Sequence, residues 1–154
     1  MRSIFLGLGI LLLDQWTKLL VRTHFYPGES RSIVEGFFNL VYVRNDGAAW
    51  NALSGQRFLL VGISVLALVL LAVFHRHFLR GGVLHRILFG LLLGGIAGNM
   101  VDRMVFGWVT DFLDFQFGSY HYPSFNVADS AICIAMVLYI LSDLFSKKKE
   151  DASA

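Results

Sequence analysis

Residues Phe58 to Phe74 read FLLVGISVLALVLLAVF, a run of seventeen residues without an ionisable side chain. A helix that crosses a bilayer needs roughly 20 mostly apolar residues, within a range of about 17–25, so this run predicts a transmembrane helix. The 154-residue chain as a whole has a matching composition, with 56% hydrophobic and 16% charged residues. Soluble domains carry roughly 25% charged residues. We therefore expect a membrane protein, and the composition excludes a disordered chain.

Three further apolar runs predict spans at residues 3–21, 84–101 and 127–145. Together with 58–74 they predict an all-α polytopic membrane protein, with four transmembrane helices in a single membrane domain of residues 1–154. The first run could instead be a cleaved signal peptide. No small-x-small cleavage site follows it, so we expect a retained span.

Basic residues gather on one side of these four spans. Seven lie before the first span, between the second and third, or after the fourth: Arg2, Arg76, Arg80, Arg86, Lys147, Lys148 and Lys149. The other connections contain Arg31, Arg44, Arg57 and Arg103. Because cytoplasmic loops are enriched in Lys and Arg, both termini are predicted to be cytoplasmic, with 147–154 as a polar tail. Nucleic acid is not expected as a partner, because the net charge of +2 comes without a continuous basic face.

The connection of residues 23–57 is long for a four-helix protein. Within it, Ser32–Val34 and Phe37–Val43 are rich in β-branched and aromatic residues, and Gly36 separates them. Such segments on either side of a glycine indicate a short hairpin. We therefore expect a small extracytoplasmic β-rich loop domain, shaped as a cradle, at the outer membrane surface.

Three glycines recur every four residues in the third predicted span, at Gly90, Gly94 and Gly98. Small residues at this spacing let two helix backbones approach closely within lipid. We therefore expect this face of the helix to pack against another helix and not to bind a ligand.

Polar side chains near the outer ends of the predicted spans are the main indication of function. They are Asp14, Asn45, Asn99, Asp102, Asn126 and Asp129, with Asp111 and Asp114 in the connection between the third and fourth spans. Ionisable groups at membrane depth are costly, and they usually line a cavity or pair with another polar group. Asn99, Asp102 and Arg103 have the spacing of one helix face. The simplest interpretation of Asp102 is a structural ion pair with Arg103 or another nearby base.

Asp111 and Asp129 are the candidate catalytic pair, because the helices on either side of the short connection between them must be neighbours. Two close carboxylates cannot both ionise easily, so the pair holds one proton and can both activate a water and protonate a leaving group. Two other interpretations stay open. The aspartates could cap a helix and a turn, or they could bind a metal ion together with Asp114 and His121. Cys133, the only cysteine, lies in an apolar run and is expected to be an inert residue buried in the core of the fourth span.

Five short motifs follow one another along the chain. They are DQWTK at Asp14–Lys18, NDGAAW at Asn45–Trp50, GGIAGNMVDR at Gly94–Arg103, VTDF at Val109–Phe112 and FNVADS at Phe125–Ser130. In these motifs the chain resembles the lipoprotein signal peptidases, the type II signal peptidases of bacteria. The departure is Trp50, where the family usually has Phe.

This resemblance implies an aspartic endopeptidase of the bacterial inner membrane, with its active site towards the outer, periplasmic face. It would remove signal peptides from diacylglyceryl-modified prolipoproteins by cutting before the lipidated cysteine. The family's catalytic pair corresponds to Asp111 and Asp129, and the family needs no metal or cofactor. Its supporting and substrate-binding positions correspond to Asp14, Lys18, Asn45, Gly47, Trp50, Asn99, Asp102, Arg103 and Asn126.

The partners that the resemblance implies are lipid-modified prolipoproteins, membrane phospholipid and globomycin-type cyclic peptides, which would occupy the pair of aspartates. A monomer is expected. We also expect residues 23–57, with Trp50, to form a lid or cradle over the pair. Two activities of other classes stay open, a phosphotransferase that holds Mg²⁺ with Asp111 and Asp114 and a proton-coupled carrier built on intramembrane carboxylates.

Overall fold

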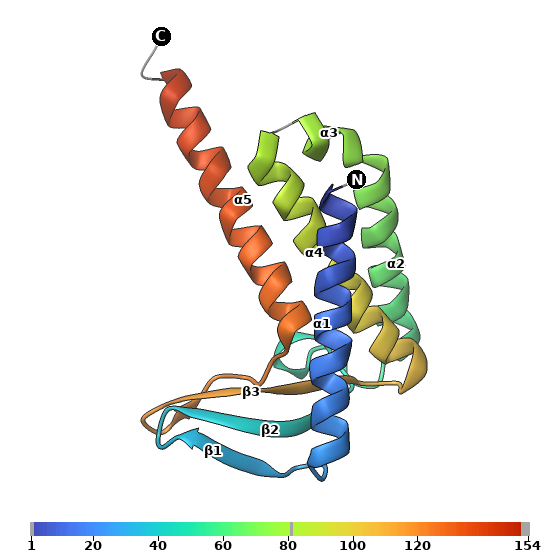
Figure 1. Ribbon diagram of the computed structural model, residues 1–154, viewed down its shortest axis with the longest axis vertical. Helices are drawn as coiled ribbons and strands as arrows, with labels where there is room; N and C mark the ends of the chain where they lie inside the picture. Colours follow the sequence, from blue (N-terminus) through green and yellow to red (C-terminus); the bar gives the residue numbers. More distant parts are fainter. Residues whose placement is uncertain (1, 81, 152–154) are drawn as a thin grey trace.

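The computed structural model describes residues 2–80 and 82–151, which form helices at one end of the molecule and a small sheet at the other (Figure 1). The helices are α1 (Arg2–His24), α2 (Arg57–Val73), α3 (His75–Arg80), α4 (Gly82–Val105) and α5 (Val127–Asp151), with a 3₁₀ turn, η1, at Ala49–Asn51. The strands are β1 (Ser30–Val34), β2 (Phe38–Asn45), β3 (Val109–Phe117) and β4 (Tyr120–His121), and they form one sheet in the order β1-β2-β3-β4.

Three helices of the described residues are long and apolar enough to cross a membrane: α1, α4 and the Val127–Phe145 part of α5. Helix α2 is also apolar, but it is shorter, with 17 residues. Helix α5 continues to Asp151, so residues 147–151 of the predicted polar tail are helical. Lysine and glutamate are good helix formers, so the segment KKKE does not end the helix. Residues 152–154 lie outside the described residues.

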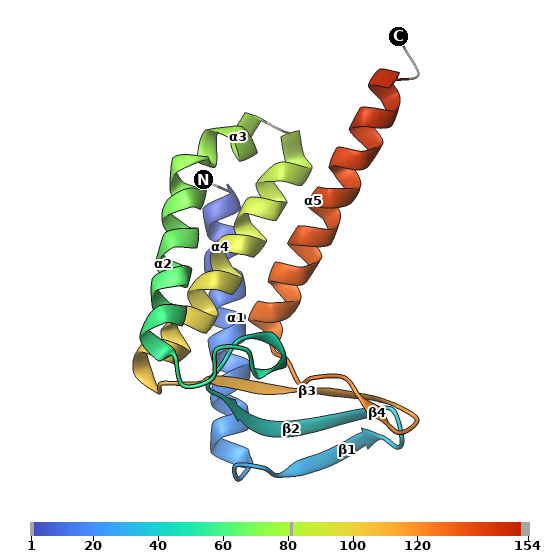
Figure 2. The same cartoon turned by 180° about the vertical axis from the view of Figure 1, so that it is seen from behind.

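The sheet lies at one end of the helical bundle, and several basic segments lie at the other. Helix α1 begins, and α5 ends, at the end away from the sheet, where the short helix α3 also lies (Figures 1 and 2). Arg2 and Arg76 therefore belong to the same end as the Lys147–Lys149 segment. The sheet and the loop that contains η1 lie at the opposite end.

The sheet confirms the predicted hairpin, since β1 pairs antiparallel with β2. Strand β2 also pairs with β3, which places Val43 opposite Asp111 and Asn45 opposite Val109. The predicted connection between the third and fourth spans contains a strand that was not predicted, since Val109–Phe117 is a nine-residue strand. The aspartates of β3 hide the strand in the sequence, because strands are depleted in aspartate. The contacts that accommodate these aspartates exist only in the folded chain.

A small apolar core fixes the sheet to α1. Val21 of α1, Tyr42 of β2 and Phe112 of β3 are buried together, and Leu40 and Val127 pack against them. Burying apolar surface contributes roughly 25 cal/mol per Å². The sheet is therefore attached to the helices by packing as well as by the chain connections.

The predicted packing face of α4 is confirmed, and its partner is α1. A Cβ atom added at Gly90 would lie 2.7 Å from the Ser3 carbonyl oxygen, and one added at Gly94 would contact the Gly7 carbonyl oxygen. A Cβ atom at Gly98 would lie 2.6 Å from a carboxylate oxygen of α1. Only glycine leaves room for this approach, which brings the polar residues of α1 and α4 together.

Replacing Gly94 with alanine is expected to destabilise the protein by about 1–3 kcal/mol, because the added methyl group has no space against α1. The matched control is Gly9→Ala in α1, where an added Cβ has no neighbour within 4 Å. That variant should be neutral or more stable, since alanine is favoured over glycine in a helix by roughly 0.5–1 kcal/mol. Thermal unfolding in detergent measures both, and equal shifts for the two variants would contradict the packing account.

Candidate active site

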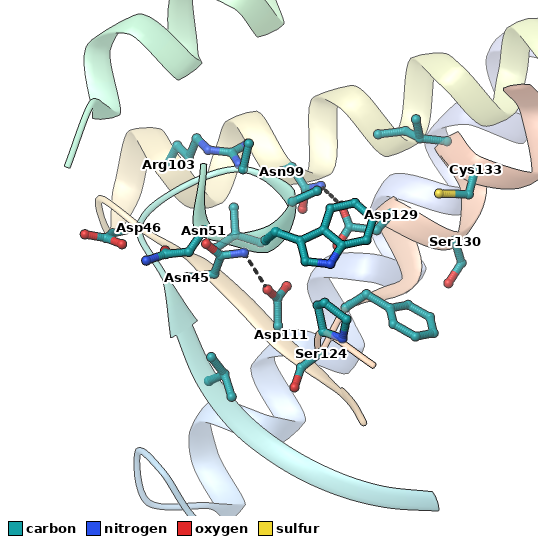
Figure 3. A pocket seen from close by; sticks show the side chains of 18 of the residues that line it. Asn45, Asp46, Asn51, Asn99, Arg103, Asp111, Ser124, Asp129, Ser130 and Cys133 are labelled. Carbon is teal, nitrogen blue, oxygen red and sulfur yellow. Dashed lines mark hydrogen bonds between the residues drawn. The ribbon is translucent and has the colours of Figure 1, made fainter. Parts of the chain in front are cut away.

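A pocket of about 930 Å³ lies where the C-terminal end of α4 and the N-terminal end of α5 meet the sheet and the loop that contains η1. Asp111 of β3 and Asp129 of α5 both line this pocket, with Asn99 and Arg103 of α4 (Figure 3). The pocket therefore brings together two aspartates that are 18 positions apart in the chain.

Asp111 is buried and held by two amides. Its Oδ2 accepts a hydrogen bond of 2.9 Å from Asn45 Nδ2, and its Oδ1 accepts one of 2.7 Å from Asn126 Nδ2. Burial, and after it the negative charge of Asp129, raises the pKa of the Asp111 carboxyl to about 7, although both amides act in the opposite direction. This carboxyl therefore keeps its proton to a higher pH than an ordinary aspartate does.

Asp129 takes part in the N-terminal cap of α5. Its backbone N–H donates to Asn126 Oδ1 at 2.9 Å, and the Asn126 backbone N–H donates to Asp129 Oδ2 at 3.3 Å. This is the reciprocal arrangement of a capping box. The other oxygen, Oδ1, accepts a hydrogen bond of 2.7 Å from Asn99 Nδ2 (Figure 3). The capping interpretation is thus correct for Asp129, and the same carboxylate also lines the pocket.

Two asparagines connect the two carboxylates. Asn126 Nδ2 donates to Asp111 and also, at 3.2 Å, to Asn99 Oδ1. Asn99 in turn donates to Asp129, and its Oδ1 accepts a hydrogen bond of 2.9 Å from Lys18 Nζ. A chain of hydrogen bonds therefore runs from one aspartate to the other and fixes their relative position.

A buried cluster of charges lies behind these amides. Lys18 Nζ is 2.9 Å from Asp14 Oδ2 and 3.4 Å from Asp102 Oδ2, and all three side chains have no exposed surface. Asp14 also accepts a hydrogen bond of 2.9 Å from the Ala128 backbone N–H, and Asp102 accepts one of 2.9 Å from that of Thr110. The cluster therefore ties α1 to α4, α5 and β3.

The expected ion pair of Asp102 exists, but Arg103 is not its partner. Lys18 fills this role together with Arg22, whose Nη1 lies 3.4 Å from Asp102 Oδ1. Arg103 Nη2 instead donates to the Gly47 carbonyl oxygen at 2.9 Å. Neighbouring helix positions face different directions, so Asp102 faces the buried charges while Arg103 lines the pocket.

The loop between β2 and α2 forms one wall of the pocket. Asn45 Oδ1 accepts a hydrogen bond of 3.0 Å from the Gly47 backbone N–H, and a Cβ atom at Gly47 would lie 2.7 Å from the Ala52 carbonyl oxygen. Trp50 lines the pocket in the left-handed backbone region, with φ of 52°, and is 70% exposed. Its ring is 6.4 Å from the ring of Tyr122 across the pocket.

Asp114 lies apart from this pocket. Its carboxylate accepts a hydrogen bond of 2.8 Å from Asn39 Nδ2 and lies 3.3 Å from His121 Nδ1. Asp114 and His121 are not among the residues that line the pocket of Asp111 and Asp129. Within the described residues, no group of three or more His, Cys, Asp or Glu side chains could hold a metal ion. The four-residue metal site considered from the sequence is thus not assembled.

Several pocket residues carry no recognisable sequence pattern. Ile63 and Ala67 of α2, Ile96 of α4 and Ile132 of α5 form an apolar part of the pocket. Such residues are common in any apolar helix, so only the packing of the helices identifies them. Cys133 also lines the pocket and is exposed, so the expectation that it is buried in a core is wrong (Figure 3).

A family model described as Signal peptidase (SPase) II matches residues 6–145. The chain belongs to this family. A lipoprotein signal peptidase of Ralstonia nicotianae is 46% identical over 147 residues, which cover 91% of this chain and 83% of that protein. One of Syntrophus aciditrophicus is 43% identical over 146 residues, 92% of this chain and 90% of that protein.

Solved structures of bacterial membrane enzymes have the same fold as this member of the signal peptidase II family. One covers 96% of this chain and 90% of its own, with a TM-score of 0.88 and 32% identity. Another covers 93% and 92%, with a TM-score of 0.82 and 33% identity. The protein is therefore a membrane protease of the signal peptidase II family, as the five motifs indicated.

Proposed function

We propose that the protein is an intramembrane aspartic endopeptidase that removes signal peptides from diacylglyceryl-modified prolipoproteins by cutting before the lipidated cysteine. The observation that carries the proposal is the pair of carboxylates, buried Asp111 and half-buried Asp129, in one pocket and joined through Asn99 and Asn126. The family supplies the substrate class. The proposed acid–base chemistry follows from the two aspartates.

In the proposed reaction the pair of aspartates holds one proton. The ionised carboxylate takes a proton from a water, whose oxygen forms a bond to the scissile carbonyl carbon. The protonated carboxyl group donates its proton to the carbonyl oxygen. The proton then returns from this oxygen to the carboxylate, which donates it to the leaving nitrogen as the C–N bond breaks. Asn99 and Asn126 keep both carboxylates oriented, and the apparent pKa values belong to the pair.

Arg103 is proposed to bind the substrate backbone beside the pair. Its Nη2 donates a hydrogen bond to the Gly47 carbonyl oxygen. Its Nε is buried and has no hydrogen-bond partner among the described residues. A buried donor without a partner is costly, and a substrate carbonyl oxygen would satisfy it.

The proposed orientation has four spans, with both termini in the cytoplasm and the pocket at the outer face of the bacterial inner membrane. Helix α2, with 17 residues, is about 25 Å long, which is close to the hydrocarbon thickness of roughly 30 Å. The basic segments lie at the end away from the sheet (Figure 2), and cytoplasmic loops are enriched in such residues. A monomer and inhibition by globomycin-type cyclic peptides belong to the same proposal.

The shape of the pocket suits a lipid-modified substrate. Ile63, Ala67, Ile96 and Ile132 offer apolar surface from three helices on the bilayer side of the aspartates. Diacylglyceryl chains on the substrate cysteine could remain in this apolar part while the scissile bond meets water at the pair. An unmodified precursor would lose the burial of these chains, at about 0.8 kcal/mol per methylene.

The experiment that tests the function compares two forms of one precursor. Purified protein in detergent should release the signal peptide from a diacylglyceryl-modified precursor and leave a new N-terminal cysteine, identified by mass spectrometry. The same precursor without the lipid is the matched control and should remain uncut. Equal cleavage of both forms, or a cut elsewhere, would refute the proposed specificity.

Trp50 is proposed to belong to a lid formed by the loop of residues 45–57. Removing its ring with Trp50→Ala should raise KM for the lipidated precursor about tenfold, since an aromatic contact of this size contributes roughly 1–2 kcal/mol. Trp50→Phe keeps an aromatic ring and should stay within about twofold of the wild type. If Trp50→Ala cleaves as well as the wild type, the lid has no role.

The proposal predicts that cleavage declines as the pH rises through about 7. Asp111 has its pKa raised to about 7, so the pair loses its last proton above that pH and can no longer act as an acid. Asn45 donates a hydrogen bond to the Asp111 carboxylate and thereby lowers this pKa. Asn45→Ala should therefore move the alkaline limb of the kcat profile to higher pH. A limb that stays in place, or moves to lower pH, would contradict this assignment.

A further inference from the structure

A second groove lies between the C-terminal part of α1 and the sheet. It has a volume of about 570 Å³, and its walls include Leu20 and Val21 of α1, Phe25 just after that helix, Ile33 of β1 and Leu40 of β2. None of its lining residues lines the pocket of the two aspartates. The groove is thus a separate apolar site between helix and sheet.

The groove lies at the boundary between hydrocarbon and headgroups in the proposed orientation, on which the inference rests. The apolar part of α1, Ser3–Val21, is about 28 Å long at about 1.5 Å per residue, so its outer end reaches the limit of a hydrocarbon core of roughly 30 Å. The groove follows the last part of α1 from Thr17 to His24, and then Phe25, across that limit. An occupant there would meet apolar walls on one side and polar groups on the other.

A pair of opposite charges lies at the edge of this groove, with Arg31 in its lining and Glu29 just outside it. Arg31 lines it, and its guanidinium is 2.8 Å from Glu29 Oε1 and lies over the Phe25 ring at 4.3 Å. Arg31 Nη2 also donates to the His24 carbonyl oxygen at 2.9 Å. These contacts use Nε and Nη2, and among the described residues Nη1 has no hydrogen-bond partner. The Arg31 side chain is 54% exposed, so this donor is accessible.

Glu29 supplies the negative half of the pair. Its Oε2 accepts a hydrogen bond of 2.8 Å from the Tyr26 backbone N–H. This bond, and after it the one from Arg31, lowers the pKa of Glu29, so the carboxylate is ionised at neutral pH. A ligand that carries a phosphate and an ammonium group next to each other would match Arg31 and Glu29 together.

We propose that this groove binds a phospholipid with a zwitterionic amine headgroup, phosphatidylethanolamine. The phosphate contacts Arg31, the ammonium group contacts Glu29, and an acyl chain lies against Leu20, Ile33 and Leu40. An anionic phospholipid such as phosphatidylglycerol has the phosphate but no ammonium group, so it leaves Glu29 beside a negative charge. The fixed charge pair therefore selects the headgroup, and the apolar walls hold the chain.

The test uses photoactivatable lipids in phosphatidylcholine vesicles that contain the whole protein. One probe has the phosphatidylethanolamine headgroup, the other has phosphatidylglycerol, and both carry the same diazirine acyl chain. Mass spectrometry locates the labelled peptides. Labelling of the exposed face of α2, at Leu66 and Val69, serves as the internal standard for ordinary contact with lipid.

We expect the phosphatidylethanolamine probe to label the groove roughly tenfold more than the phosphatidylglycerol probe, relative to α2, because one hydrogen bond between charged groups is worth about that factor. Arg31→Gln and Glu29→Gln should each remove this preference. Arg57→Gln, an arginine at the same end of the molecule but outside the groove, should keep it. Equal labelling by the two probes, or a preference that survives both groove variants, would overturn the proposal. Cleavage of precursor is measured separately, so failure here leaves the catalytic proposal intact.

Discussion

Asp129→Asn is expected to reduce cleavage of a lipidated precursor by roughly 10³-fold or more, and Asp111→Asn by a similar factor. Proton transfer by a positioned side chain contributes about 10²–10⁴-fold, and each variant removes one of the two carboxylates that share the proton. Asparagine keeps the size of the side chain. It can still accept the hydrogen bonds from Asn99 or Asn126 through its carbonyl oxygen, so the fold should persist.

The double variant distinguishes a working pair from two independent groups. If the aspartates act as one unit, Asp111→Asn with Asp129→Asn should be no slower than the slower single variant, because either change alone already removes the function of the pair. If they act independently, the factors should multiply. Single-turnover cleavage in detergent measures all four proteins, and thermal unfolding verifies that each one is folded. If the rate reductions of the two single variants multiply in the double variant, the aspartates do not act as one unit.

Lys18→Met is expected to have the largest effect on stability, a loss of about 3–5 kcal/mol. Removing one partner of a buried ion pair leaves the other as an uncompensated buried charge. Asp14 and Asp102 would both lose Lys18, and neither carboxylate is exposed to water. Asn99 would also lose the hydrogen bond of 2.9 Å that it accepts from Lys18. Because Asn99 donates to Asp129, the Asp129 carboxylate should become less well oriented.

A surface ion pair of the same length is the matched control. Arg31 lies 2.8 Å from Glu29, whereas Lys18 lies 2.9 Å from Asp14, but the Arg31 side chain is 54% exposed. Exposed pairs contribute about 0–1 kcal/mol, so Arg31→Met should change unfolding in lipid-free detergent by no more than this. The contrast isolates burial as the cause. Similar losses for the two variants would show that the buried cluster contributes no special stability.

The sequence alone was enough to predict the long helices and the hairpin. Apolar runs located α1, α2, α4 and the first part of α5, and β-branched and aromatic segments around Gly36 located β1 and β2. The short helix α3 and the extension of α5 beyond residue 145 were not predicted. Strand β3 was missed. Its aspartates weaken the strand pattern, and it is completed by pairing with β2, which lies more than sixty residues earlier in the chain.

The residues that form the site could be predicted, but their contacts with one another could not. Spacing and the family motifs indicated Asp111 and Asp129, and the structure brings both to one pocket. The partner of Asp102 could not be deduced from its neighbour Arg103, since Lys18 lies 84 positions away in the chain and is brought close only by the contact of α1 with α4. The apolar pocket wall likewise depends on which helices pack together.

The most direct test of the central claim compares Asp111→Asn with Asp114→Asn in cleavage of a diacylglyceryl-modified precursor. The two aspartates lie three positions apart on the same strand, but only Asp111 lines the pocket with Asp129, while Asp114 is bound to Asn39 and lies beside His121. The two-aspartate account predicts that Asp111→Asn slows cleavage by roughly 10³-fold or more and that Asp114→Asn retains most of the wild-type rate. An active Asp111→Asn variant beside an inactive, folded Asp114→Asn variant would contradict the account.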